Sequence, residues 1–322
     1  MREIAITQIG NVKIGHAQND RLGTGCTVLI FAEGAPAGVD VRGGGPASRE
    51  TELLNPLAGP EKIHAVLFAG GSAFGLDAAG GVMRYLAERG IGYQTSSAVV
   101  PLVCASCIYD LSVGSPAAFP DQDMAYAACE DAQNNLLRQG NVGAGVGATV
   151  GKYKKDRRLM MKSGLGLYAA ESGDLKIGAL AVVNAFGDVY DGGKIVAGML
   201  ADGGAGFACT DEMMCRDCFG ARGALAENTT LAAVVTNAAF NKPQLAKIAA
   251  MAQDGLARAI SPVHTMADGD SVYALSVGGV AADINIAGTI AARVVERAIL
   301  NAVQNAGSAY GLKAARDMAA PL

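Results

Sequence analysis

One stretch constrains this chain more than any other, because an Asn and two Thr lead directly into an apolar run. Asn228, Thr229 and Thr230 precede Leu231–Val235. The run has the composition of a buried strand, so the two hydroxyls stand at its entrance. A hydroxyl held there is a candidate nucleophile. The same pattern also fits two Thr that simply begin a strand, where β-branched residues are common.

Thr229 can act as a nucleophile only with a base close by. Threonine is a weak nucleophile unless a base lies beside it. If the chain breaks just before Thr229, the new α-amino group is that base. Its unperturbed pKa of about 7.7–8.0 lies close to working pH.

The composition bounds the class of protein. Hydrophobic residues make up 51% and charged residues 17% of the 322 residues, which predicts a large core and a homo-oligomer that hides a charge-poor surface. The net charge is −4, and basic residues gather only at Lys152–Arg158, which we interpret as a solvated charged loop. Nucleic acid is therefore not the expected partner.

The chain shows neither a signal-peptide core at its start nor a run of 18 or more apolar residues. We expect a cytoplasmic protein without a membrane partner, with its seven cysteines reduced. Strands and helices alternate irregularly, and Ser163–Ala170 with Lys176–Phe186 reads as a hairpin. The pattern predicts one α/β (α+β) sandwich over residues 1–322 rather than a parallel doubly wound sheet. Long helices are expected over Gln122–Gln139 and about Ile284–Asn305.

Two glycine-rich turns are candidate sites. Gly43-Gly44-Gly45-Pro46 is either a strand exit with ion pairs or a nest for an anion or a carbonyl oxygen. Gly70-Gly71-Ser72 opens an expected helix and could hold an anion or an oxyanion. Ser72 is also a possible nucleophile, although the Gly-x-Ser-x-Gly elbow is absent. No phosphate-binding loop follows, so we exclude nucleotide binding.

The cysteines form two Cys-x-x-Cys pairs, Cys104/Cys107 and Cys215/Cys218. Four thiolates could hold a structural zinc ion. The pairs are more than a hundred residues apart and the first lies in an apolar run, which favours buried thiols instead. The three His are scattered, so we expect no catalytic metal and no cofactor.

Five stretches in this order resemble the L-aminopeptidase/D-esterase family, the self-processing aminopeptidases that include the β-peptidyl aminopeptidases. They are Asp40–Leu54, Gly70–Asp77, Gly140–Gly147, Val182–Gly187 and Asn228–Leu231. The resemblance covers about residues 3–315. It implies an αββα sandwich, similar to the N-terminal-nucleophile hydrolases but with different connectivity. It also implies self-cleavage into an α piece, 1–228, and a β piece, 229–322, and assembly of several αβ units.

The resemblance assigns roles by position. The bond broken is Asn228–Thr229, and Thr229 is the nucleophile, with Thr230 next if the register slips by one. Asn184 matches the family's oxyanion-stabilising Asn. Asp268 and Asp270 stand where the family has a hydroxyl residue and a Glu, so an Asp replaces each.

Substrate contacts are expected from Tyr109, which falls close to a family Tyr, and from Ser72. The expected activity is release of N-terminal residues from short peptides, amides or esters. Two alternatives stay open: an ornithine acetyltransferase-like acyl transferase, which also self-cleaves before a Thr, and a non-catalytic homologue that only binds a ligand.

Overall fold

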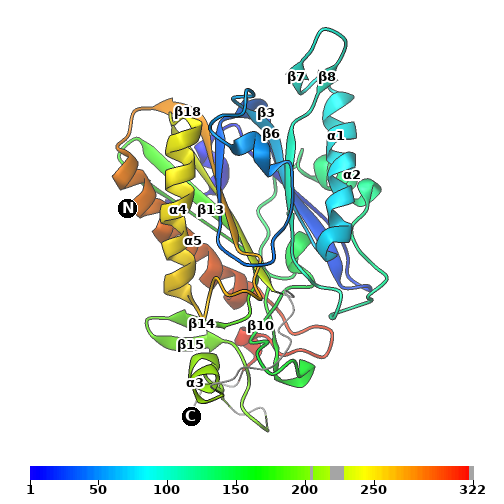
Figure 1. The fold of residues 1–322 in the computed structure, drawn as a ribbon, viewed down its shortest axis with the longest axis vertical. Helices are drawn as coiled ribbons and strands as arrows, with labels where there is room; N and C mark the ends of the chain where they lie inside the picture. The colour runs from blue at the N-terminus through cyan, green and yellow to red at the C-terminus, as the bar shows by residue number, and fades with distance from the viewer. Residues whose placement is uncertain (204–205, 218–227, 319–322) are drawn as a thin grey trace.

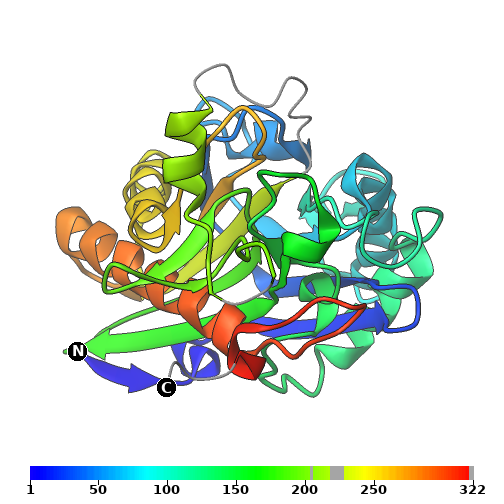
Figure 2. The ribbon, with the colours of Figure 1, turned by 90° about the horizontal axis from the view of Figure 1, so that it is seen from below.

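The computed structural model describes residues 1–203, 206–217 and 228–318. Two large β-sheets lie face to face, and helices cover the outer face of each sheet (Figures 1 and 2). Helices α4 and α5 lie on one side and α1 and α2 on the other. The predicted αββα sandwich is confirmed.

The first sheet carries the Thr-Thr strand at its centre. In spatial order its strands are β1 (Arg2–Ile4), β12 (Leu165–Ser172), β13 (Leu175–Asn184), β16 (Thr229–Ala238), β18 (Ser271–Val280) and β4 (Ala37–Val41). Strands β16 and β18 are parallel, and the other neighbours are antiparallel. The predicted hairpin is β12 and β13.

The second sheet is also mixed, with β6 and β9 parallel. Its order is β2 (Lys13–Asn19), β3 (Thr24–Ala35), β6 (Ile63–Ala69), β9 (Val103–Cys107) and β5 (Ala47–Arg49). Smaller sheets pair β7 (Tyr93–Gln94) with β8 (Val99–Val100), β10 (Thr149–Val150) with β11 (Met161–Lys162), and β14 (Asp188–Asp191) with both β15 (Lys194–Ala197) and β17 (Ile260–Ser261).

The helices of the described residues include one shortened relative to the prediction, and one, Thr210–Arg216, in a segment that the sequence indicated to be a loop. They are α1 (Ala79–Ala87), α2 (Gln122–Asp131), α3 (Thr210–Arg216), α4 (Lys242–Ala259) and α5 (Ile284–Asn305). The α5 bounds match the prediction, whereas α2 ends before Gln139. Asn135 adopts a left-handed φ of 47° and accepts a hydrogen bond from Ile14 N through its side chain, at 2.9 Å, so the helix cannot continue through it.

Strand β16 reads as a continuous apolar run because both of its faces are buried. Ala232 and Val234 face the core under α4 and α5, whereas Leu231, Ala233 and Val235 face the core between the two sheets. Successive side chains of a strand point to opposite faces, so each face collects every second residue. The same alternation separates Thr229 from Thr230.

Among the helices of the part of the chain that the structure describes, none combines the length and the apolar composition that a membrane-spanning segment requires.

Candidate active site

Three strand ends meet at Thr229. Because β13 and β16 are antiparallel, the last residue of β13, Asn184, lies opposite the first residue of β16, Thr229. Because β16 and β18 are parallel, the turn before β18 lies beside the start of β16, and Asn228 pairs with Asp268. The topology therefore gathers residues from three distant segments at one edge of the first sheet.

The carbonyl of Asn228 is held next to the Thr229 hydroxyl. Its oxygen accepts a hydrogen bond from the main-chain N–H of Gly269 at 2.8 Å and a second from Thr229 Oγ1. Attack of Oγ1 on this carbonyl carbon would build negative charge on an oxygen that already has a main-chain donor. Gly269 was no candidate in the sequence, since its role depends on the pairing of two distant strands.

Thr230 points the other way. Its side chain is fully buried, and among the described residues its Oγ1 has no hydrogen-bond partner. Its main-chain N–H donates to Asp270 Oδ1 at 2.7 Å. The hydroxyl that meets the carbonyl of Asn228 is that of Thr229, so the geometry favours Thr229 over Thr230 as nucleophile.

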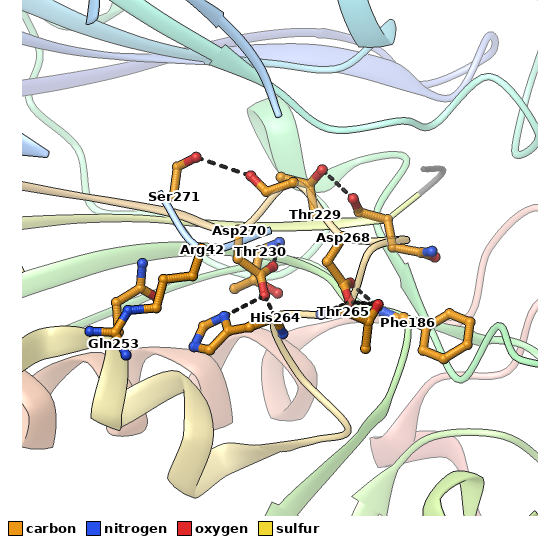
Figure 3. Close-up of polar contacts among 12 residues, drawn as sticks. Arg42, Phe186, Thr229, Thr230, Gln253, His264, Thr265, Asp268, Asp270 and Ser271 are labelled. Atoms are coloured by element: carbon orange, nitrogen blue, oxygen red, sulfur yellow. Dashed lines mark hydrogen bonds and ion pairs between the residues drawn. The ribbon is translucent and has the colours of Figure 1, made fainter. Parts of the chain in front are cut away.

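Asp270 is fixed from two sides. Besides Thr230 N–H on Oδ1, it receives two bonds on Oδ2 from His264, one from its main-chain N–H at 3.0 Å and one with Nδ1 at 2.9 Å (Figure 3). Asp270 is 1% exposed. A buried carboxylate with these contacts holds the start of β16 in place. His264 was missed in the sequence because a single His in a polar turn carries no spacing signal.

Asp268 lies on the other side of the same turn. Its Oδ1 accepts from Phe186 N–H at 3.2 Å, and its Oδ2 accepts from Thr265 N–H at 3.2 Å and from Thr265 Oγ1 at 2.5 Å (Figure 3). Burial, and then the charge of Asp270, raise the pKa of Asp268 to about 6 from an ordinary 3.8. Asp268 therefore keeps its proton to a higher pH than an exposed aspartate does.

The glycine-rich turn after β4 clamps this Asp-Gly-Asp segment. Arg42 N–H donates to Asp270 O at 3.0 Å, and Gly45 N–H donates to Asp268 O at 2.8 Å. A Cβ on Gly43 would lie 2.4 Å from both Asp268 O and Asp270 N, so only glycine fits there. The turn thus binds carbonyls of the chain itself, and Arg42 pairs with Asp40 at 2.8 Å, as expected for a strand exit with ion pairs.

Asn184 is fully buried, and its amide is bonded at both ends. Its Nδ2 donates to Tyr109 O at 3.1 Å, and its Oδ1 accepts from Thr149 N–H at 3.1 Å and from Lys152 Nζ at 2.7 Å. In the uncut chain the Asn184 amide thus binds Tyr109 rather than the Asn228 carbonyl. Tyr109 joins the site through its main chain.

Lys152 corrects one sequence interpretation. We expected Lys152–Arg158 to be a solvated charged loop, but Lys152 is only 8% exposed. Its Nζ donates to both the main-chain and the side-chain oxygen of Asn184, at 3.0 and 2.7 Å. A run of charges usually marks a solvated segment, and burial of its first member follows from a tertiary contact that local pattern does not carry. The site therefore holds a cation next to Asn184.

Other sequence candidates lie apart from these contacts. Ser72 N–H donates to Ile108 O at 2.9 Å, and no hydrogen bond joins Ser72 to the site residues within the described chain. Cys104 and Cys107 are buried in β9, while Cys218 lies outside the described residues. No group of three or more His, Cys, Asp or Glu able to hold a metal occurs in the part of the chain that the structure describes.

Comparison with known proteins decides the family. The model of peptidase family S58 matches residues 5–316. The chain belongs to peptidase family S58. This S58 peptidase is 36% identical to an uncharacterized aminopeptidase of Mycobacterium bovis, over 98% of this chain and 97% of the relative. It is 32% identical to the 6-aminohexanoate-oligomer endohydrolase of Kocuria sp., over 94% of this chain and 87% of that one.

The solved structures agree on the fold. The L-aminopeptidase D-Ala-esterase/amidase of Ochrobactrum anthropi superposes with a TM-score of 0.71 at 20% identity, covering 98% of this chain and 91% of that chain. The predicted family resemblance is confirmed, and this S58 peptidase is a hydrolase that acts as an aminopeptidase or amidohydrolase. The acyl-transferase and non-catalytic alternatives are not favoured.

Proposed function

We propose that the chain cuts itself between Asn228 and Thr229 and then uses Thr229 as an N-terminal nucleophile. The observation that carries this proposal is the contact of Thr229 Oγ1 with the Asn228 carbonyl, whose oxygen also accepts from Gly269 N–H. The reacting groups of the cleavage step are therefore already side by side in the uncut chain.

The first reaction is an acyl shift followed by hydrolysis. Thr229 Oγ1 forms a bond to the carbonyl carbon of Asn228, and the Asn228–Thr229 amide bond breaks as its nitrogen takes up a proton. Water then hydrolyses the ester, leaving a carboxylate on Asn228 and a free amine on Thr229. The products are the α piece, 1–228, and the β piece, 229–322.

In the processed enzyme, Thr229 Oγ1 attacks the carbonyl of a short peptide, amide or ester, and its own amine takes the proton. Asp270 and Asp268 orient this amine by fixing the turn beside it. Asn184 supplies an oxyanion donor, and Lys152 adds a positive charge at the same place. The charge-poor composition supports a homo-oligomer of processed αβ units.

A substrate assay tests this function. We expect wild-type protein to hydrolyse amino-acid p-nitroanilides and amides, and Thr229→Val to lose all turnover. Hydroxylamine added as an acceptor should divert only a minor share of the acyl group. Activity retained in Thr229→Val would contradict the assignment of the nucleophile, and product formed mainly as hydroxamate would identify an acyl transferase instead.

A further inference from the structure

A buried carboxylate lies one residue after the carbonyl that binds the Asn184 amide. It belongs to Asp110, which is 2% exposed. Its Oδ1 accepts from the main-chain N–H of Gly71 and its Oδ2 accepts from Thr24 Oγ1, at 2.7 Å each. Burial of a carboxylate is unfavourable unless its oxygens are hydrogen-bonded, and here both of them are.

Two glycine-rich stretches of the sequence fit closely around this carboxylate. A Cβ on Gly70 would lie 1.9 Å from Asp110 Oδ2, and a Cβ on Gly147 would lie 2.5 Å from Asp110 Cβ. Only a residue without a side chain allows so close an approach at these two positions. The turn at Gly70-Gly71-Ser72, expected to hold an anion or an oxyanion, thus binds a carboxylate of the chain itself.

The same turn fixes the chain on both sides of Tyr109. Ser72 N–H donates to Ile108 O at 2.9 Å, and Gly71 N–H donates to Asp110. These bonds follow from the topology, because β6 and β9 are parallel neighbours and their ends lie side by side. The carbonyl of Tyr109 belongs to the peptide unit that joins it to Asp110, so anchoring the neighbours limits how that carbonyl can turn.

The Tyr109 carbonyl sets the direction of the Asn184 amide. An Asn amide is planar and carries two N–H donors on one nitrogen. Asn184 donates one of them to Tyr109 O at 3.1 Å, and no further hydrogen bond among the described residues uses its Nδ2. Since Asn184 lies opposite Thr229 in the pairing of β13 and β16, the second N–H is the donor left for an oxyanion at Thr229.

Asp110 also acts on the other end of the Asn184 amide, through charge. Burial raises the pKa of Asp110 to about 6 from an ordinary 3.8, against the opposing effects of its two hydrogen bonds and of the charge of Lys152. The Nζ of Lys152 donates to Asn184 Oδ1 at 2.7 Å. The carboxylate therefore influences Asn184 from two directions.

We propose that Asp110 is a positioning residue of this S58 peptidase: it holds the Tyr109 carbonyl so that Asn184 presents its second N–H to the oxyanion. The inference rests on the proposed function, because it takes Asn184 as the oxyanion donor. Asp110 acts through Tyr109 and Asn184 and not on the substrate.

A double-mutant cycle with Asn184 tests the proposal. With Asn184 in place, Asp110→Ala should lower kcat of the cut enzyme for an amino-acid p-nitroanilide about tenfold or more, since misplacement by about 1 Å costs on the order of 100-fold. In an Asn184→Ala background the same change should lower kcat less than about twofold, because the donor that Asp110 positions is gone. An equal fold-loss in both backgrounds, or no loss with Asn184 in place, would overturn the proposal.

A conservative variant separates positioning from the loss of a side chain. Asp110→Asn keeps an oxygen for Gly71 N–H, and its amide can donate to the hydroxyl of Thr24. It should therefore recover most of the kcat that Asp110→Ala loses. An Asp110→Asn enzyme as slow as Asp110→Ala would contradict positioning through these hydrogen bonds.

Asp188→Ala is the matched control for removal of a buried carboxylate. Asp188 is also fully buried, and its oxygens accept from Met199 N–H at 2.8 Å and from Thr210 N–H at 2.7 Å. Any loss of kcat in this control should be the same with and without Asn184. A control loss that also disappears in the Asn184→Ala background would show that the cycle measures stability, and would overturn the proposal.

A milder variant keeps the test available if Asp110→Ala fails to fold or to cut itself. Thr24→Val removes the bond to Asp110 Oδ2 and leaves the bond from Gly71. It should lower kcat by a smaller factor than the tenfold of Asp110→Ala, about threefold, and only where Asn184 is present. No loss, or the same loss without Asn184, would count against the proposal.

A spectroscopic measurement does not depend on activity. In the uncut Thr229→Val chain, the side-chain amide resonances of Asn184 can be assigned by their absence after Asn184→Ala. They should shift when Thr24→Val or Asp110→Ala is added, because the acceptor of one N–H moves. Unchanged resonances in a folded protein would overturn the proposal.

The outcomes separate the inference from the function on which it rests. If Asn184→Ala alone leaves kcat unchanged, Asn184 is not the oxyanion donor, and that part of the proposed function fails together with the inference. If Asn184→Ala lowers kcat and Asp110→Ala does not, only the role of Asp110 is contradicted.

Discussion

At the scale of single residues, two adjacent threonines have opposite environments. Thr229 Oγ1 meets the Asn228 carbonyl, whereas Thr230 Oγ1 is buried without a hydrogen-bond partner among the described residues. Strand alternation accounts for the difference, since neighbours face opposite sides of the sheet. The pair therefore offers an internal comparison within one strand.

Thr230→Val should leave self-cleavage intact and raise the free energy of unfolding by about 1 kcal/mol. Valine keeps the β-branched shape and removes a buried hydroxyl that lacks a partner. Denaturant unfolding of both proteins, with the cleavage site blocked by Thr229→Val, measures the difference. Loss of stability, or loss of cleavage in Thr230→Val alone, would show that the buried hydroxyl has a role.

Asn184→Ala should lower kcat by about two to three orders of magnitude, as removal of one oxyanion donor does. It should also destabilise the fold by about 1–3 kcal/mol, because Thr149 and Lys152 lose their common acceptor in the interior. Asn237→Ala is the matched control, since its side chain bonds Asp174 O and Lys176 N–H at the far end of the strand. A kcat loss as large in the control would make the Asn184 effect one of stability.

The pH dependence of self-cleavage should report Asp268. Its pKa is about 6 in the uncut chain, so the group is protonated below that pH and ionised above it. Burial and the charge of Asp270 favour the protonated form, but only the ionised form accepts from all three donors without presenting an O–H of its own, and we take it as the form that cleaves. We expect the cleavage rate to rise between about pH 5 and pH 7, and Asp268→Asn to remove this rise. If the cleavage rate of Asp268→Asn still rises with pH as in the wild type, another titrating group is responsible for the rise.

At the scale of elements, the site depends on how β16 and β18 pair. Their parallel pairing places the turn before β18 against the start of β16, so Gly269 N–H reaches the Asn228 carbonyl. The turn after β4 holds that arrangement from the other side. Main-chain hydrogen bonds thus connect the turn after β4 to the turn before β18, and that turn to the start of β16.

Gly269→Ala should slow self-cleavage at least tenfold. A Cβ there would lie 2.6 Å from Thr229 Oγ1 and 2.9 Å from Gly45 O, so the hydroxyl or the turn has to move, and displacement of a reacting group by about 1 Å costs on the order of 100-fold. Gly279→Ala, near the far end of β18 with open space at its Cβ position, is the control. Time courses on a denaturing gel measure both, and equal rates would contradict the close approach.

At the scale of the whole molecule, the sequence predicts the layers better than the contacts between them. The strand after Thr229, the hairpin of β12 and β13, and helix α5 carry strong local periodicity, and all three were found. Lys152 and Gly269 enter the site through contacts between distant segments. The local pattern of apolar and polar residues does not predict such contacts. His264 lies only six residues before Asp270, and it was missed because a single His in a polar turn carries no spacing signal. Asn184 and Asp270 were predicted as site residues from the family resemblance and not from the periodicity.

The most direct test of the central claim is the intact mass of the purified protein, with N-terminal sequencing of its pieces. At about 101 Da per residue, from 32.6 kDa over 322 residues, cleavage before Thr229 gives pieces of roughly 23 and 9.5 kDa. We predict these two masses for the wild type, the smaller piece beginning at Thr229, and one uncut chain for Thr229→Val. A folded wild-type protein that stays at 32.6 kDa, or a cut at another bond, would contradict the account.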